Sequence, residues 1–162
     1  MSEDNGPGEA LVAAIGHYLE QSGKLLNLVS EQPNSDELLA VQLAPDAFDT
    51  GFHLAVAIQF AARALCLPTG DPVPEIVEPC SLQSLRSLHE DVLSAINRVP
   101  AIDWDSNVTH TAGEAELTQR ATDYVACFAF PNMLFHFTQA YAGLRHAGLK
   151  IGKADFDGLH MY

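Results

Sequence analysis

The sequence predicts an all-α fold, a four-helix bundle with a short hairpin or irregular insertion before the last helix. Four long segments carry apolar residues at the three-to-four-residue spacing of a helix face. Strand-like alternation is confined to one stretch near residues 108–118, too little for a sheet-based fold. With 162 residues, 48% of them apolar, the chain has the length and composition of one domain with a full core. Helix-on-helix packing is the architecture that buries such faces.

The first expected helix spans about residues 9–31. Its apolar positions follow helical spacing: Leu11, Val12, Ile15, Leu19, Leu25, Leu26 and Val29. Residues 1–8 are acidic and contain Gly and Pro, so we expect them to be mobile and the single domain to span residues 9–162. Tyr18 interrupts the apolar face, where it can bury its ring and place its hydroxyl at a pocket or at the surface.

The second expected helix starts near Pro45 or Asp46 and continues to about Leu67. Several helix breakers follow it, namely Pro68, Gly70 and Pro72. The helix is apolar on most of its circumference, which is typical of a central, buried helix. His53 shares a stripe of this helix with small and aromatic residues, among them Phe60. An imidazole on such a face is either a hydrogen-bonded core residue or a functional group.

The third expected helix follows a loop with four prolines, residues 68–80. Ser81 is a good N-cap, and the apolar residues after it repeat with a clear helical period as far as Pro100. Beyond this helix, Val108–His110 and Glu116–Thr118 can pair as a short hairpin. His110 is expected on the edge of that hairpin, in solvent.

The last expected helix carries the most informative stretch of the chain, residues 128–146. Most of its circumference is apolar, yet Asn132, His136 and Gln139 lie at i, i+4 and i+7 and share one face. A polar stripe on a buried helix needs partners, because unpaired buried polar groups are destabilising. The stripe has two interpretations: a hydrogen-bonded core network that fixes the helix register, or a ligand or catalytic pocket lined by His136.

Both ends of this last helix have features of their own. It begins between Gln119 and Pro131, with or without a kink at the proline. Cys127 lies among apolar residues and is expected to be buried. The tail after Gly148 contains Ile151, Phe156 and Leu159, which we expect to pack back on the bundle.

Charge and composition exclude several classes of partner. The formal net charge is −13, from 21 acidic and 8 basic residues, and a field of that sign repels nucleic acid and anionic lipid surfaces. No uninterrupted apolar run of about 18 residues is present, so we expect no membrane span. The N-terminal MSEDNGPGEA lacks the regions of a signal peptide, and the three cysteines form no C-x-x-C pair. Free thiols in a reducing compartment indicate a cytoplasmic protein.

The segment from Phe128 to Gly158 reads FAFPNMLFHFTQAYAGLRHAGLKIGKADFDG, and LAPDAF (Leu43–Phe48) and Tyr124 precede it. Together these motifs resemble one branch of the DinB/YfiT-like four-helix bundles, an uncharacterised domain-of-unknown-function family of bacteria and fungi. The resemblance extends over about residues 9–158. It implies an up-down-down-up order of the helices and, because such bundles are often dimeric, a homodimer.

DinB-like relatives include metal-dependent thiol transferases, and the resemblance therefore raises the question of a metal. Those relatives bind a divalent metal with one His of the second helix and a His-x-x-x-His pair of the fourth. Here Ala140 stands four residues after His136, and His146 lies about 80° around the helix. His53 and His136 with Asn132 make a poor transition-metal site, because neutral amides are weak ligands. We expect no metal and no other cofactor.

These observations lead us to expect a small organic molecule as the partner. In the first hypothesis, the protein is a metal-independent isomerase, cyclase or lyase in which His53 or His136 is the general acid or base, since imidazole exchanges protons at neutral pH. The residues expected to contact the substrate are Asn132, Gln139, Tyr141, Tyr18 and Phe60.

Two alternatives remain open. One is a DinB-type metal-dependent enzyme that adds a ligand such as Asp46 or Asp49 to the two histidines, a hypothesis that rests on analogy of fold. The other is a binding or interaction module without catalysis, which the acidic surface and the apolar central helices equally allow.

Overall fold

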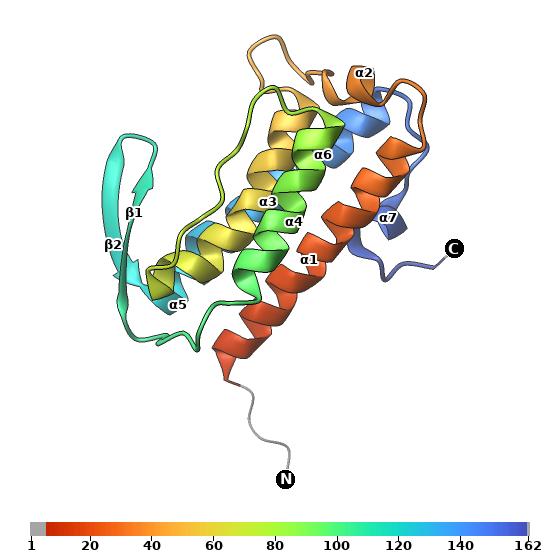
Figure 1. The fold of residues 1–162 in the computed structure, drawn as a ribbon. Helices are drawn as coiled ribbons and strands as arrows, with labels where there is room; N and C mark the ends of the chain where they lie inside the picture. Colours follow the sequence, from red (N-terminus) through yellow and green to blue (C-terminus); the bar gives the residue numbers. More distant parts are fainter. Residues whose placement is uncertain (1–5, 162) are drawn as a thin grey trace.

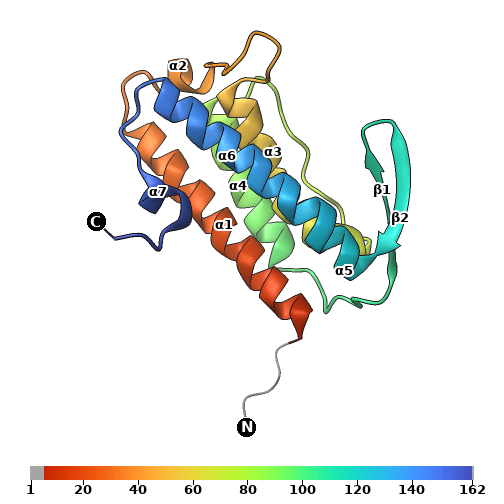
Figure 2. The ribbon, with the colours of Figure 1, turned by 180° about the vertical axis from the view of Figure 1, so that it is seen from behind.

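The computed structural model describes residues 6–161 and shows a helical bundle with one hairpin attached (Figure 1). The four long helices are α1 (Pro7–Ser30), α3 (Thr50–Cys66), α4 (Leu82–Ile96) and α6 (Phe130–His146). α1 and α6 run in one direction, and α3 and α4 run in the other (Figures 1 and 2). The shorter elements are α2 (Ser35–Leu39), η1 (Leu67–Thr69), α5 (Ala121–Tyr124), η2 (Val125–Ala129) and α7 (Lys153–Asp157). The strands β1 (Asn107–Ala112) and β2 (Ala115–Arg120) make the fold mostly helical rather than purely all-α.

Side-chain caps determine where two of the long helices begin. Ser81 accepts a hydrogen bond from the Ser84 N–H at 3.2 Å, so α4 starts as the sequence predicts. Asp49 accepts one from the Phe52 N–H at 2.7 Å, and α3 therefore starts at Thr50. The predicted start near Pro45 or Asp46 is wrong, because the Asp49 carboxylate caps the helix and the residues before it form turns.

At the N-terminus, α1 includes Pro7 and Gly8, so the prediction that these two residues belong to a mobile segment is wrong. Gly8 is packed under the Trp104 indole, where an added Cβ would lie 2.2 Å from the ring. Gly6 is the N-cap of α1, and residues 1–5 of that expected mobile segment lie outside the described part of the chain.

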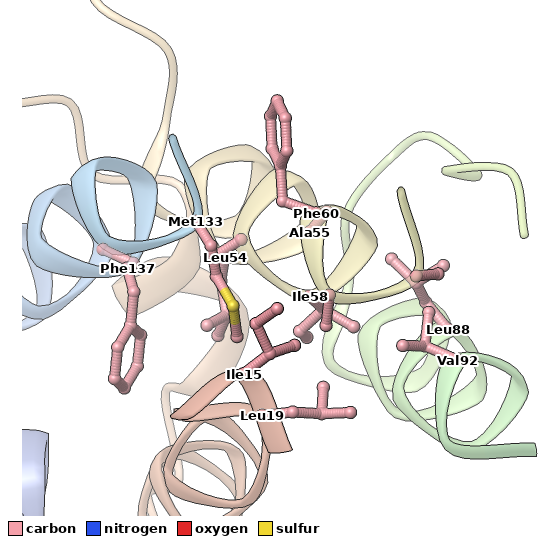
Figure 3. Packing of buried hydrophobic residues seen from close by; sticks show 14 of the residues in the cluster. Ile15, Leu19, Leu54, Ala55, Ile58, Phe60, Leu88, Val92, Met133 and Phe137 are labelled. Atoms are coloured by element: carbon pink, nitrogen blue, oxygen red, sulfur yellow. The ribbon is translucent and has the colours of Figure 1, made fainter. Parts of the chain in front are cut away.

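α3 forms the centre of the core, as Figure 3 shows. Its inward side chains meet buried residues from the three other long helices: Ile15 and Leu19 of α1, Leu88 and Val92 of α4, and Met133 and Phe137 of α6. Thr50–Thr69 has the length and hydropathy of a membrane span, yet 72% of that window is buried inside the bundle. This is the position of a core helix in a soluble fold.

α5, η2 and α6 form one continuous helical segment with a wider, π-helical turn at Val125–Ala129. The helix thus begins well before Pro131. Proline has no N–H and its ring crowds the carbonyl four residues earlier, so a wide turn immediately before it relieves that clash. Cys127, in this turn, is exposed, and the prediction that it is buried is wrong. An extra residue in a helical turn rotates the side chains around the helix axis, which a strict α-helical period does not anticipate.

The hairpin pairs as the sequence predicts, with Thr109 opposite Thr118 and His110 opposite Leu117. Gly113, at φ 61°, occupies the first position of the two-residue turn, where left-handed backbone is required. The prediction that His110 is in solvent is wrong, because only 5% of it is exposed. The hairpin packs on the start of the last helical segment, and the His110 ring lies 4.7 Å from Tyr124 and 4.3 Å from Phe128 between centroids.

The tail folds back on the bundle through α7, which lies beside α1 (Figure 2). Phe156 stacks on Phe137 at 4.8 Å between centroids, and Ile151 is buried. His17 of α1 is hydrogen-bonded through Nε2 to the Asp157 carbonyl at 2.7 Å. Leu159 is 75% exposed, so its expected packing is wrong.

Candidate functional site

His53 of α3 and His136 of α6 face each other across the two helices that pack most extensively on each other. Their Nδ1 atoms are 2.9 Å apart, a normal hydrogen-bond length. His53 is buried and His136 is half-buried. Each helix is held in this register by its own packing, since Leu54 and Ile58 of α3 and Met133 and Phe137 of α6 point into the core (Figure 3).

The hydrogen bond between the two Nδ1 atoms defines complementary tautomers. One Nδ1 carries the shared proton and donates it, so that ring has a bare Nε2. The other Nδ1 accepts, so its Nε2 carries a hydrogen. Among residues 6–161, His110 Nδ1 is the only side-chain nitrogen or oxygen that is fully buried and has no hydrogen-bond partner. The two Nε2 atoms of the pair have no partner either, so they are not fully buried and reach solvent. The pair therefore offers one proton acceptor and one proton donor to a ligand.

Both rings are neutral at physiological pH. Burial lowers the pKa of His53, and the nearby Asp49 carboxylate opposes this shift in part. Burial, and next the neighbouring His53 ring, lower the pKa of His136 to about 4. An unprotonated imidazole pair is the state that can accept a proton from a ligand.

Aromatic side chains surround the pair. Phe60 stacks on His136 with centroids 6.2 Å apart, and it points away from Ile15 and Leu19 of the core (Figure 3). Phe48 and Phe135 contact His53 edge-on and are 58% and 55% exposed. Large exposed aromatic groups beside buried polar atoms are typical of a binding surface. We call Phe48 and Phe135 the aromatic rim.

The other residues expected to contact a substrate divide into two groups. Phe60 and Asn132 are near the pair, but the Asn132 amide donates to the Phe128 carbonyl at 2.7 Å and so secures the wide turn. Gln139 is half-buried one turn after His136. Tyr18 and Tyr141 are not brought to the pair. Both contact Phe156 of α7, at 5.6 Å and 5.7 Å between centroids.

The donor set does not fit the metal centre of DinB-like enzymes. Residues 6–161 contain no cluster of three or more His, Cys, Asp or Glu side chains able to hold a metal. The Asp49 carboxylate caps α3, and Ala140 supplies no ligand where the His-x-x-x-His pattern requires one. Catalytic zinc sites use three protein ligands, whereas this pair supplies two.

Sequence reasoning missed the aromatic rim. Phe135 precedes His136 directly, and Phe48 ends the LAPDAF motif, so both were present in the segments that carry the family resemblance. Their role depends on their exposure to solvent, which cannot be deduced from the sequence when an apolar residue lies in an apolar segment.

Comparisons with known proteins agree with this fold. The family model "Domain of unknown function (DUF1993)" matches residues 9–157. A crystal structure of a DinB family member from Shewanella denitrificans is 23% identical and has a TM-score of 0.77, over 93% of this chain and 91% of that one. At that identity the likeness concerns the fold alone. None of the curated proteins matches. The expected likeness of the fold to DinB-like bundles is confirmed, and the chain belongs to the DUF1993 family.

Proposed function

We propose that the protein binds a small organic molecule at the His53–His136 pair and catalyses a proton transfer on it without a metal. The observation that supports this is the neutral imidazole pair joined at Nδ1, with both Nε2 atoms open. An isomerase, cyclase or lyase reaction of this kind needs one group that removes a proton and one that supplies it.

The two tautomers determine the chemistry. The bare Nε2 of one ring removes a proton from the substrate as the shared proton crosses to the other Nδ1. In the same concerted step, the second ring releases its own Nε2 proton to the substrate. One proton enters and one leaves, so the pair ends neutral with its two tautomers exchanged. No separate imidazolium forms, which suits a site where burial disfavours the charged ring.

The aromatic rim would hold the apolar part of the substrate. Phe48 and Phe135 are exposed beside the pair, and Phe60 stacks on the His136 ring. Aromatic surfaces provide much contact area with little conformational entropy to lose. We therefore propose an apolar or aromatic compound with an acidic C–H next to a carbonyl.

Proton exchange in D₂O tests this function without knowledge of the product. A panel of small enolisable ketones and keto acids is followed by NMR for loss of the signal of the exchanging proton. We expect the wild-type protein to exchange at least one compound about a hundredfold faster than the His53→Ala/His136→Ala double variant, in line with the usual size of acid–base catalysis. His146→Ala, on the exposed end of α6, is the matched control and should retain the wild-type rate. Equal exchange by the wild type and the double variant across the panel would contradict the proposal.

The aromatic rim also supports a second candidate, an interaction module without catalysis. Phe48 and Phe135 form an exposed apolar patch over the pair, and a second copy of the chain is the occupant that the expected homodimer would place there. Sedimentation analysis of wild type and Phe48→Ser/Phe135→Ser separates the alternatives. A dimer that dissociates in this variant favours the interaction module, and an unchanged mass leaves the rim to the small molecule.

A further inference from the structure

A cavity lies between the C-terminal half of α3 and strand β1, apart from the histidine pair. Its volume is about 370 Å³, and its lining includes Arg63, Leu67, Val73 and the β1 residues 109–111. Phe60 lies next to both sites: its ring stacks on His136, and the Arg63 guanidinium lies 4.8 Å from the ring centroid. No acidic side chain is among the described residues that line this cavity.

Arg63 is a half-buried cation without a carboxylate. The ion pairs among residues 6–161 join Lys24 to Glu20, Arg120 to Asp105, and His160 to Asp157, and none includes Arg63. Its guanidinium is close enough to the Tyr124 hydroxyl to oppose the rise of the tyrosine pKa, which burial raises to about 12. A half-buried guanidinium that no acid neutralises is available to an anion.

Strand β1 presents its free edge to the same cavity. The hairpin closes with a two-residue turn between Ala112 and Ala115, so that pair exchanges backbone hydrogen bonds and alternate pairs do not. Thr109 therefore belongs to a pair without ladder bonds, which agrees with its hydroxyl lying 2.9 Å from that of Thr118. By the same alternation, the N–H groups of Thr109 and Thr111 point away from β2, and no hydrogen bond to another described residue involves them.

His110, between these two threonines, has an unsatisfied atom. Its Nε2 donates to the Gln119 side-chain oxygen at 2.7 Å, which leaves Nδ1 as an acceptor. Nδ1 is fully buried and has no partner. A buried acceptor of this kind needs a donor such as a water molecule, and it does not itself hold an anion.

We propose that this cavity binds a small organic carboxylate with an apolar tail. Arg63 and the outward N–H group of Thr109 or Thr111 hold the carboxylate, and Leu67 and Val73 contact the tail. The combination of a guanidinium with a backbone N–H group is suited to an anion with two oxygens. The site is independent of the proposed proton-transfer function, and its ligand can bind whether or not the histidine pair is catalytic.

NMR titration with benzoate, at constant ionic strength, tests the site. We expect saturable shifts of the Thr109 and Thr111 amide signals and of the Arg63 side-chain signal. Arg63→Gln should weaken binding by about tenfold or more, the loss expected for a charge-assisted hydrogen bond. Arg86→Gln removes the same charge from the exposed face of α4 and should bind benzoate like the wild type. His136→Ala should also bind normally, which keeps this result separate from the proposed catalysis.

Several results would overturn the proposal. Absence of saturable shifts at these three groups is one, and equal weakening by Arg63→Gln and Arg86→Gln is another. Inorganic phosphate that binds as tightly as benzoate would exclude the apolar-tailed carboxylate as the ligand class. If Arg63→Gln does not fold, Arg63→Lys keeps the charge but loses the fork of donors, and it should give intermediate affinity.

Discussion

At the scale of single residues, the histidine pair affects both the proposed proton transfer and the stability of the bundle. A hydrogen bond between two neutral imidazoles satisfies two polar atoms inside an apolar helix pair, which explains why the bundle tolerates them. Protonation of the accepting Nδ1 would remove the acceptor of that bond, and protonation of either ring would place a charge beside aromatic side chains. The feature that makes the pair a candidate for proton transfer therefore also makes it sensitive to acid.

The low pKa of His136 gives a first prediction. Burial and His53 lower this pKa from its usual 6.5 to about 4, so the unfolded chain binds a proton more readily than the folded one. The corresponding stability is complete above pH 6.5 and is lost as the pH falls towards 4. His136→Gln should reduce this loss, measured as the free energy of urea unfolding at a series of pH values. His146→Gln is the control, and a wild-type slope in His136→Gln would contradict the assigned pKa.

The aromatic rim gives a second prediction at the same scale. Phe48 and Phe135 are each more than half exposed, so replacing them removes little buried area. Phe48→Ser and Phe135→Ser should each change the free energy of unfolding by less than about 1 kcal/mol, because surface substitutions rarely cost more. Phe60→Ser, at a buried position on the same face, should cost several-fold more. Urea unfolding measures all three, and a large loss in either rim variant would show that the rim is structural.

At the scale of elements, the spacing between α3 and α6 decides whether the two histidines meet. Gly143 permits the close approach, since a Cβ there would lie 2.2 Å from the Thr50 hydroxyl oxygen. That hydroxyl donates to the Val41 carbonyl at 2.8 Å, so the contact also holds the loop before α3. The contact that sets the α3–α6 distance therefore lies two turns of α6 away from His136.

A matched pair of glycine substitutions tests this contact. Gly143→Ala should destabilise the protein by about 1–3 kcal/mol, as overpacking usually does, and should shift the NMR signals of His53 and His136. Gly16→Ala, at a helical position of α1 with open space around it, should stabilise by about 1 kcal/mol through helix propensity. Chemical unfolding measures both. Equal effects of the two variants would show that the α3–α6 approach tolerates a larger residue.

At the scale of the whole molecule, local signals predicted most of the fold. Helical period placed the four long helices, Ser81 predicted the start of α4, and the turn at Gly113 predicted the hairpin. These features depend on residues close in sequence. The wide turn at Val125–Ala129 and the burial of His110 depend on packing between distant segments, which a single sequence does not reveal.

The candidate site was predicted in part, for the same reason. His53 and His136 were identified because each is a polar residue on an apolar helix, but their contact through Nδ1 depends on the α3–α6 distance. Tyr18 and Tyr141 have the residue type expected in a pocket, yet they lie at α7 on another side of the bundle. Residue type and helical face indicate polarity, whereas the neighbour across the bundle is set by tertiary packing.

The relation between fold and ligand set gives the last prediction. The chain has a DinB-like fold but two imidazoles where a catalytic metal needs three protein ligands. Dialysis against EDTA should therefore leave the thermal midpoint of the wild type unchanged, and added Zn²⁺ should not raise it. Ala140→His restores the i, i+4 spacing to His136, so Zn²⁺ should stabilise this variant, by about 2.7 kcal/mol at a hundredfold excess over its Kd. Ala140→Gln introduces a side chain of similar size without an imidazole and should not respond to Zn²⁺. If Zn²⁺ instead stabilises the wild type and His53→Ala abolishes this effect, the histidine pair binds metal together with a further ligand.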